Sequence, residues 1–373
     1  MQINEQRLID EFMELVQIDS ETQHEAKIAS ALKTKFTNLG LIVEEDQAEE
    51  QTGHEANNLI CTLKGQKAGV EPIYFTSHMD TVAPGVGITP SIEEDYIVSD
   101  GTTILGADDK AGLAAIIEMI RTLQEQEIEH GDIQLVITVG EESGLVGARA
   151  LDSSLLTAKY GYAVDSNGKV GNMIVAAPSQ AKLEITSQGK KAHAGVAPEE
   201  GLSAITLAAK AISKMPLGRI DDETTANIGR FEGGQATNVV CDEAYILAEA
   251  RSLEASKLDQ QIQQMQEACR QAEDEVGGSI KVEVRHMYPG YKHEDGERVV
   301  EVVKQAAQQI GRNSELLSSG GGSDANIIAG YGIPTVNLCV GYENIHTTEE
   351  RIPVQELVKI AELLTAISVE AAK

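Results

Sequence analysis

Four short apolar runs in this chain end abruptly in acidic or imidazole side chains, and they restrict the folds that the chain can adopt. They read "PIYFTSHMD", "IQLVITVGEE", "YGYAVDSNG" and "IPTVNLCVGYENIH". Short and nearly continuous apolar runs are typical of central strands that are buried on both faces of a sheet. The stretch "DDKAGLAAIIEMIRTLQEQ", between the first two runs, has the apolar spacing of a helix. This alternation predicts an α/β fold with a mixed, largely parallel sheet flanked by helices.

The order of elements changes near Ala177. Strands are predicted at 182–188, 227–234, 244–253 and 279–288, and helices at 198–215 and 255–276. The order βαββαβ is that of a ferredoxin-like α+β module. The strand predicted at 333–340 then resumes the first pattern. We therefore expect one domain formed by 1–178 and 292–373, with a ferredoxin-like domain inserted at 179–291.

Charge and composition exclude several classes of partner. A length of 373 residues suggests two domains, and the formal net charge of −29 repels phosphate backbones and anionic lipid. The sequence therefore predicts neither nucleic acid nor a membrane as a partner. It shows no secretory signal pattern and no apolar run long enough to span a bilayer, so we expect a cytoplasmic protein. The four cysteines lie far apart without CxxC spacing, which predicts buried free thiols.

Polar side chains at the ends of the apolar runs form the candidate site. In open α/β sheets, ligands bind at the carboxyl ends of the strands. The residues expected at that edge are His78, Asp80, Glu141, Glu142, Asp165 and His346. Asp108 lies where a loop enters the helix predicted after it, so it can reach the same edge. Carboxylates and imidazoles crowded into one cleft predict a multivalent cation, because they would otherwise repel one another.

The donor set indicates which metal would bind. Imidazole with carboxylate suits zinc, with cobalt or manganese as substitutes, whereas calcium and magnesium sites seldom use histidine. Two ions held about 3.5–4 Å apart need a bridging carboxylate, which Asp108 could supply. The other ligands then form two pairs, His78 with Asp165 and Glu142 with His346.

Two acidic residues remain for other roles. Glu141 is free to act as a general base. Asp80 follows His78 by two positions, and side chains at i and i+2 of a strand face the same side. Its carboxylate is therefore expected to accept the second imidazole proton of His78 and to orient the ring.

Each of these residues also has a plainer interpretation. A single histidine such as His78 or His346 is more often a surface or hydrogen-bonded core residue than a ligand. Glu141 and Glu142 could form a solvated turn, and Asp165 could cap the following loop. The metal site is favoured because all of them occupy strand ends or the loop that enters a helix.

The inserted domain contributes two further candidates. His193 precedes a helix entered through Pro198, where it could serve the helix entrance or donate to a developing oxyanion. Arg251 alternates with apolar residues in a strand, so it is either an exposed-face charge or a fork for a substrate carboxylate. The stretch "SSGGGSDANI" is similar to an anion-binding glycine loop, but it lacks the Gly-Lys-Ser/Thr of a nucleotide-binding loop.

The sequence resembles the M20 family of metallopeptidases, and within it the tripeptidase T (peptidase T)-like branch. The resemblance rests on "SHMDT", "LGADDKAG", "VGEESG", "AVDSNG", "KAHAG", "ATNVV", "AEARS", "GGSDAN" and "NIHTTEE", in family order over nearly the whole chain. It implies a zinc exopeptidase-type catalytic domain with two Zn²⁺ per subunit. It also implies that the inserted domain serves as a lid and often mediates homodimer formation.

The resemblance also assigns the ligands. His78, Asp108 and Asp165 match the ligands of one zinc ion. Asp108, Glu142 and His346 match the ligands of the other.

The remaining positions match residues that act on the substrate. Glu141 matches the general base and Asp80 the acid behind the histidine ligand. His193 matches the oxyanion histidine, which in dimers of the family serves the partner's active site. Asn238 and Arg251 match positions that contact the terminal carboxylate of the substrate.

These inferences together predict a dizinc exopeptidase that hydrolyses short peptides and releases the N-terminal residue. Asp rather than Glu at position 165 is the form that the resemblance associates with aminopeptidase or dipeptide chemistry. An N-acyl-amino-acid amidohydrolase or a carboxypeptidase on the same scaffold is the alternative. A metal-dependent binding protein that has lost catalysis is a third hypothesis.

Overall fold

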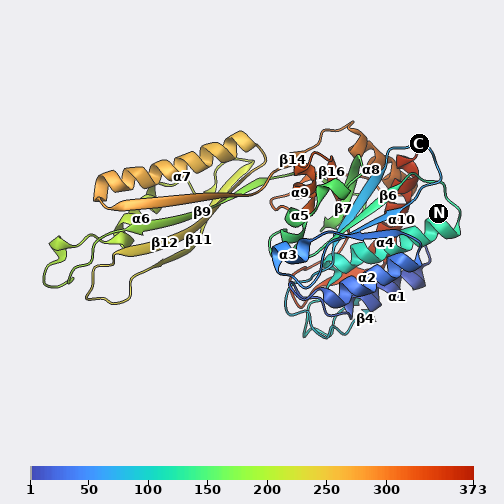
Figure 1. Ribbon diagram of the computed structural model, residues 1–373, viewed down its shortest axis with the longest axis horizontal. Coiled ribbons are helices and arrows are strands. Elements are labelled where there is room, and N and C mark those ends of the chain that lie inside the picture. Colours follow the sequence, from blue (N-terminus) through green and yellow to red (C-terminus); the bar gives the residue numbers. More distant parts are fainter. Residues whose placement is uncertain (1) are drawn as a thin grey trace. The chain divides into compact units, whose positions relative to one another are not determined.

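The structure is a computed structural model that describes residues 2–373. The chain forms two compact units, which are described separately below (Figure 1). The first contains the residues up to Ala176, His293–Ser318 and Ser323–Lys373, and the second contains Ala177–Lys292 and Ser319–Gly322. The insert expected at 179–291 lies wholly inside the second unit. The sequence did not indicate that Ser319–Gly322 belongs with it.

The first unit is built on a mixed sheet. Its strands are β1 (Ile42–Glu45), β2 (Leu59–Leu63), β3 (Ile73–His78), β6 (Ile133–Thr138), β7 (Tyr160–Ser166), β8 (Met173–Ala177), β15 (Leu316–Ser318) and β16 (Thr335–Cys339). They lie in the order β1-β2-β6-β3-β7-β16-β8, with β15 beside β8. The central neighbours β6, β3, β7 and β16 are parallel, and β2 and β8 join them through antiparallel pairings. The predicted α/β class with a largely parallel sheet is confirmed.

Helices cover both faces of this sheet. They are α1 (Glu5–Val16), α2 (Ala26–Asn38), α3 (Ala48–Thr52), α4 (Ala107–Glu125), α5 (Val146–Ala150), η1 (Ser153–Leu155), α8 (Arg298–Gln309), α9 (Asp324–Gly330) and α10 (Val354–Ala371). Phe75 of β3 lies in the larger hydrophobic cluster, which includes side chains of α4 and α10. The adjacent Tyr74 lies in a separate cluster with Ile328 of α9. Successive strand residues therefore pack on opposite faces, as the apolar runs predicted.

A small second sheet lies in the loops of the first unit. Its strands are β4 (Ser91–Glu93), β5 (Tyr96–Val98) and β17 (Arg351–Pro353). They lie in the order β17-β5-β4. This sheet connects the segment that leads toward α4 with the segment that follows β16.

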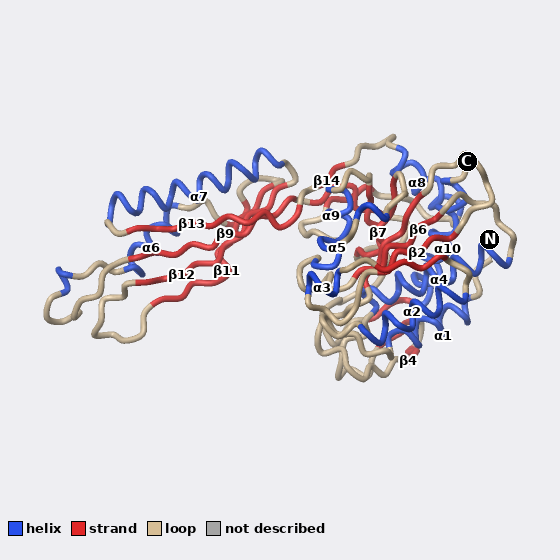
Figure 2. Tube along the Cα trace, in the orientation of Figure 1, coloured by secondary structure: helices blue, strands red, loops and turns tan. Residues whose placement is uncertain are grey.

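The second unit has the predicted two-layer βαββαβ order. Its elements are β9 (Ser179–Gln188), η2 (Pro198–Glu200), α6 (Ala204–Lys214), β10 (Gly218–Arg219), β11 (Thr224–Gly233), β12 (Glu243–Ser252), α7 (Ala255–Val276), β13 (Ser279–Tyr288) and β14 (Tyr291–Lys292). Its antiparallel sheet has the order β10-β11-β12-β9-β13. The four long strands run side by side (Figure 2), and α6 and α7 pack against each other and against β9 and β12.

The helix predicted at 198–215 is wrong in its first part. Pro198–Glu200 forms a 3₁₀ turn, Gly201 is extended, and the α-helix begins at Ala204. The side chain of Ser203 accepts a hydrogen bond from Thr206 N at 3.2 Å and so caps a new helix. The serine hydroxyl competes with helix continuation, which apolar spacing alone did not reveal.

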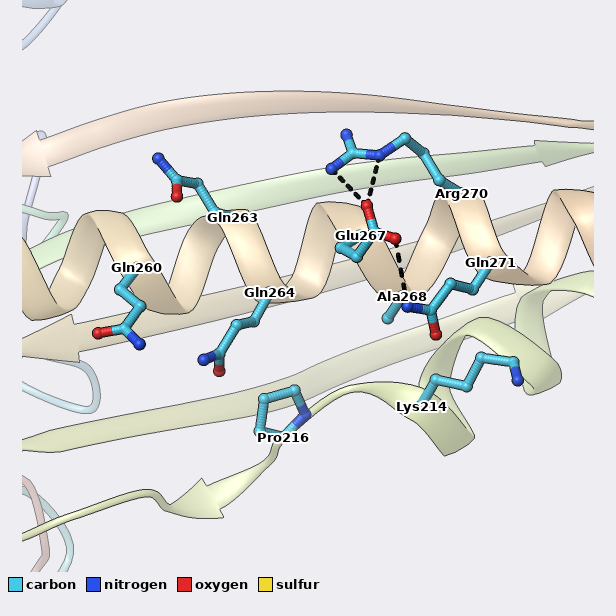
Figure 3. A pocket seen from close by; sticks show the side chains of 9 residues that line it. All are labelled: Lys214, Pro216, Gln260, Gln263, Gln264, Glu267, Ala268, Arg270 and Gln271. Atoms are coloured by element: carbon cyan, nitrogen blue, oxygen red, sulfur yellow. Dashed lines mark hydrogen bonds and ion pairs between the residues drawn. The ribbon is translucent and has the colours of Figure 1, made fainter.

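A polar groove of about 550 Å³ lies beside α7 in the second unit (Figure 3). Amide side chains of α7 line it together with Lys214 and Pro216. Glu267, on the same face, already binds Arg270 and Gln271. The candidate site residues lie elsewhere.

Two expectations drawn from composition can be compared with the structure. All four cysteines are buried and unpaired, as predicted. Within residues 2–373, the helices include none that is both long and apolar enough to cross a membrane.

The buried face of β9 offers a test of the second unit. Leu183 is fully buried in its core, whereas the adjacent Lys182 points to solvent. We expect Leu183→Ala to lower the free energy of unfolding by about 2–5 kcal/mol because it leaves a cavity. Lys182→Ala, the control, should change it by less than about 0.5 kcal/mol. Urea unfolding followed by circular dichroism measures both values, and equal effects would contradict this packing.

Candidate metal centre

The predicted site residues of the first unit meet at the carboxyl edge of the parallel strands. His78 is the last residue of β3, and Asp165 is the next-to-last residue of β7. Glu142 follows β6, His346 follows β16, and Asp108 lies at the start of α4. The backbone of Asp108 and Asp109 is not helical, so the helix predicted to begin at 108 is regular only after these residues. This break lets the Asp108 side chain turn toward the strand ends.

One cluster contains His78, Asp108 and Asp165. One ligand atom from each residue lies within 4.8 Å of the others. His78 Nε2 is 3.0 Å from Asp108 Oδ1 and 3.9 Å from Asp165 Oδ1. The three side chains therefore present donors to a common point.

A second cluster contains Asp108, Glu142 and His346, within the same mutual distance of 4.8 Å. His346 Nε2 is 3.0 Å from Glu142 Oε1 and 3.3 Å from Asp108 Oδ2. Asp108 thus faces the first cluster with Oδ1 and the second with Oδ2. The structure brings together the two ligand sets expected from the sequence, and a single carboxylate belongs to both.

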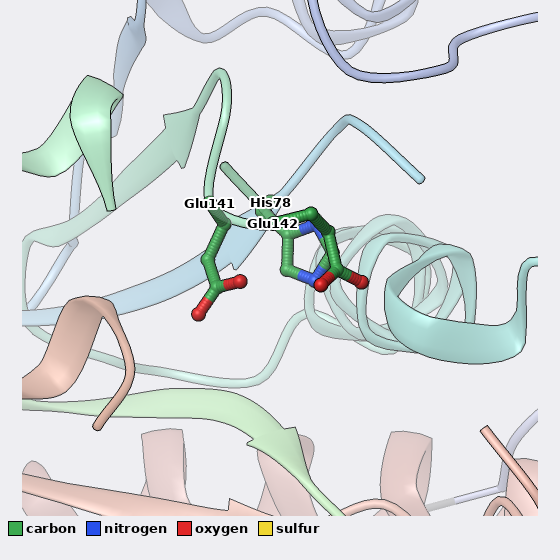
Figure 4. Close-up of side chains that lie close together, drawn as sticks. All are labelled: His78, Glu141 and Glu142. Atoms are coloured by element: carbon green, nitrogen blue, oxygen red, sulfur yellow. The ribbon is translucent and has the colours of Figure 1, made fainter. Parts of the chain in front are cut away.

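Glu141 lies beside these clusters. Figure 4 shows its side chain next to those of His78 and Glu142, and donor atoms of the three lie within 4.8 Å of one another. Burial raises the pKa of Glu141 well above its usual value, and the charges of Asp324 and Glu142 raise it further. A carboxyl group whose pKa is raised above that of an exposed glutamate suits a general base.

The electrostatics of the ligand residues depend on the two histidines. Burial raises the pKa of Asp165 well above its usual value, and the charge of Asp108 adds to this. Burial acts on Asp108 in the same direction, but His346 and His78 bring its pKa below its usual value. Burial would lower the pKa of His78, yet Asp108 and Asp80 raise it. Divalent cations would replace this proton-dependent compensation, so the residues fit a metal centre of imidazole and carboxylate donors.

Asp80 lies beside the ring of His78, but strand alternation does not place it there. β3 ends at His78, so the strand alternation expected to align the two side chains does not extend to Asp80. The ring Nδ1 of His78 lies 2.9 Å from the backbone carbonyl of Asp80 and 3.4 Å from its carboxylate. The carboxylate also accepts hydrogen bonds from Glu141 N at 3.0 Å and Glu142 N at 3.3 Å. One residue therefore orients the histidine and also fixes the turn that carries both glutamates.

Glu350 has a supporting role that the sequence interpretation missed. Its side chain is only 2% exposed. Its carboxylate accepts backbone hydrogen bonds from Leu105 at 2.8 Å, Gly106 at 2.7 Å and Asp108 at 3.0 Å. The loop that carries His346 is therefore attached to the loop that carries Asp108. The only signal was the presence of Glu350 in the "TTEE" that follows His346.

Lys110 is a second residue that the sequence interpretation missed. It is fully buried, and its Nζ donates to the backbone carbonyl of Met79 at 2.9 Å and to Ser20 Oγ at 2.7 Å. Burial lowers its pKa to about 8 despite the surrounding carboxylates. The cation holds the turn between His78 and Asp80. Its position in "DDKAG", two residues after Asp108, was the available signal.

The three predicted residues of the second unit fall into two groups. The exposed His193 and Asn238 lie in neighbouring loops, since Ala194 N donates to Asn238 O at 3.0 Å and His193 pairs with Val239. Arg251 lies near the other end of β12, roughly 27 Å along the strand from Glu243 at about 3.4 Å per residue. The sequence could not show this separation.

The guanidinium of Arg251 is already engaged. Its Nε and Nη2 donate to the Glu249 carboxylate at 3.0 and 3.2 Å, and its Nη1 donates to Gly320 O at 3.1 Å. The glycine loop thus contributes a carbonyl acceptor here. In the second unit, this loop therefore lies beside the guanidinium of Arg251.

Comparison with known proteins identifies the family. The model of peptidase family M20/M25/M40 matches residues 74–370, and the chain therefore belongs to this family. The predicted class, a metallopeptidase that hydrolyses peptide bonds, is confirmed at this level.

Several relatives are similar over their whole length. The Bacillus subtilis protein YqjE is 64% identical over 371 residues, which cover 100% of both chains. The solved structure of aminopeptidase PepT from Bacillus cereus ATCC 10987 has a TM-score of 0.96 and 65% identity, with 100% of both chains covered. A tripeptidase structure from Staphylococcus aureus has a TM-score of 0.95 and 50% identity, with 99% of both chains covered. These similarities confirm the resemblance to the peptidase T-like branch.

Asp165 allows the cost of an ionised carboxyl group at this site to be measured, a cost that arises first from burial and then from the charge of Asp108. The pKa of Asp165 is raised in the folded chain, so folding favours the neutral form of this carboxyl group. The stability gained from the neutral form is present at low pH and is lost as the pH rises through the raised pKa. At neutral pH without metal, Asp165→Asn should therefore raise Tm by about 2 °C. With zinc added, the variant should gain less than the native chain, because it lacks a ligand charge. Thermal unfolding after chelation, and again with zinc, checks both signs. A lower Tm for the metal-free variant would contradict this account.

Proposed function

We propose that the chain is a dizinc exopeptidase that releases the N-terminal residue of short peptides. The observation that carries this proposal is the position of Asp108, whose two carboxylate oxygens face different ligand clusters. A shared carboxylate between ions about 3.5–4 Å apart is the arrangement of binuclear hydrolases. His78 and Asp165 would complete one metal position, and Glu142 and His346 the other.

The donor types favour zinc. Each cluster offers one imidazole and two carboxylates. Zinc binds both donor types, and catalytic zinc is typically held by three protein donors with a fourth position left for water or substrate. Cobalt and manganese accept similar donors and are the expected substitutes.

Glu141 would carry the proton transfers. Bound divalent cations would polarise the scissile carbonyl and lower the pKa of water at the site. Glu141 takes a proton from the attacking water and delivers it to the nitrogen of the leaving amine. Asp80 keeps Glu141 in place through the hydrogen bond that its carboxylate accepts from the Glu141 backbone.

The relatives support short peptides and N-terminal release. The 65% identical structure is that of an aminopeptidase, and the 50% identical one is that of a tripeptidase. The guanidinium of Arg251 would bind the terminal carboxylate of such a substrate, which would replace the Glu249 carboxylate as its partner. His193 and Asn238 lie at the other end of the same sheet from Arg251. One small peptide therefore cannot contact all three residues when they belong to the same chain. We therefore include a homodimer in the proposal, in which His193 of the partner subunit donates to the oxyanion.

Glu141→Gln tests the general base. We expect kcat to fall by about 10²–10⁴-fold, because the amide cannot accept the proton from water. Zinc content should be unchanged, since Glu141 is not an assigned ligand. Metal analysis and peptide hydrolysis measure the two effects. Glu94→Gln, in an exposed turn, is the control and should keep full activity. Near-normal turnover of zinc-loaded Glu141→Gln would remove this role.

Polarity of cleavage has its own test. An unblocked tripeptide should be cleaved at its first peptide bond, and N-terminal acetylation should reduce kcat/KM by about tenfold or more, because a charged end group fixes the register of a short substrate. Mass spectrometry of the products identifies the released residue. Preference for the acetylated peptide would instead support an N-acyl-amino-acid amidohydrolase or a carboxypeptidase.

A further inference from the structure

Asp165 lies at an irregular position in the central sheet. β7 and β16 pair in parallel, but their register shifts: Asn337 is opposite Ala163, and Cys339 is opposite Ser166. β7 therefore carries one extra residue over this stretch, which is the mark of a bulge. Bulges redirect side chains and are common beside active sites.

The side chain of Asn337 closes this bulge. Its Oδ1 accepts a hydrogen bond from Asp165 N at 3.0 Å, and its Nδ2 donates to Asp165 O at 2.7 Å. Both backbone groups of Asp165 are thus satisfied by one side chain of the neighbouring strand. The backbone is fixed, and the direction of the carboxylate is left to a different contact.

That contact is made by Tyr342. Its phenol donates to Asp165 Oδ1 at 3.1 Å, and its side chain is only 2% exposed. The same oxygen, Oδ1, is the one that faces His78 Nε2. A phenol is protonated at neutral pH and can donate to a carboxylate, so the contact fixes which oxygen is presented and in what direction.

The support of Asp165 is separate from that of the second cluster. Among the clusters formed by residues 2–373, Asp165 belongs only to the one with His78 and Asp108. Glu142, in the other cluster, is held through its backbone by Asp80, and Asp108 is held through its backbone by Glu350. Loss of the Tyr342 hydroxyl would therefore release one ligand and leave the others supported.

We propose that Tyr342 is a positioning residue that sets the zinc affinity of the position formed by His78, Asp108 and Asp165. The other position keeps its affinity. This inference rests on the proposed function, because it requires two zinc ions. Hydrogen-bond partners of metal ligands typically change affinity by about 10–100-fold.

Tyr342→Phe removes the hydroxyl and keeps the ring. The full-length chain, freed of metal by chelation, is titrated with zinc in competition with a chromophoric chelator. We expect two binding steps in the native chain. In the variant, one step should weaken by about tenfold or more, and the other should stay within about twofold.

Tyr162→Phe is the matched control. Tyr162 lies in β7, the strand of Asp165, three residues before that aspartate, and is fully buried. Its phenol oxygen has no hydrogen-bond partner among residues 2–373. Removal of this hydroxyl should leave both zinc steps unchanged.

A double-mutant comparison separates positioning from a general loss of structure. Asp165→Asn should weaken the same step as Tyr342→Phe, and adding Tyr342→Phe to Asp165→Asn should weaken it little further. Fully additive losses would overturn the inference. Unchanged steps, or equal weakening of both steps, in Tyr342→Phe would do so as well.

The outcome for the native chain tests the proposed function separately. Fewer than two zinc ions per native chain would refute the dizinc proposal, and this inference with it. Two ions in the native chain with an unaffected Tyr342→Phe would refute this inference alone. If circular dichroism shows that Tyr342→Phe is unfolded, Tyr342→Met, which also lacks the hydroxyl, is held to the same expectation.

Discussion

The carboxylate of Asp108 stands between two imidazoles, and the rest of the centre is arranged around this contact. Its oxygens lie 3.0 Å from His78 Nε2 and 3.3 Å from His346 Nε2. The carboxyl groups of Asp165 and Glu141 lie half-buried nearby, where burial and like charge raise their pKa values and so disfavour ionisation. Such a group stays ionised in a folded core only when positive charge compensates it. Histidines supply part of this charge, and divalent cations would supply the remainder.

The loops that hold this centre are attached to one another by buried polar side chains. Asp80 binds the backbone of the glutamate turn, Glu350 binds the loop of Asp108, and Asn337 binds the backbone of Asp165. Most of these contacts use backbone amides or carbonyls, so they fix the direction of each loop as well as its position. Rigid strands therefore set the coarse geometry, and polar contacts between loops set the fine geometry that a metal centre needs.

Features that depend on neighbouring residues in the sequence were predicted more accurately than features that depend on single contacts. The apolar runs ending at His78 and at Glu141 predicted buried strands correctly, because burial on both faces leaves its pattern in adjacent residues. The Asp80 carboxylate lies 3.4 Å from Nδ1 of His78, as the prediction required, but strand alternation does not place it there because β3 ends at His78. The helix expected from Pro198 begins at Ala204, because the hydroxyl of Ser203 caps it. The helix error arises because a single hydrogen bond overrides a periodic pattern.

The sequence by itself determined the layer architecture, the inserted ferredoxin-like unit and the residue types that meet at the sheet edge. Each of these follows from local periodicity or from the rule that parallel strands end at one edge. Only the tertiary structure decided that the two oxygens of Asp108 face different clusters, that Glu350 and Tyr342 support the ligands, and that Arg251 lies at the opposite end of β12 from the loop of His193. These features depend on contacts between residues far apart in the chain. Their geometry is set by packing in three dimensions, so it produces no periodic pattern of residue types in the sequence.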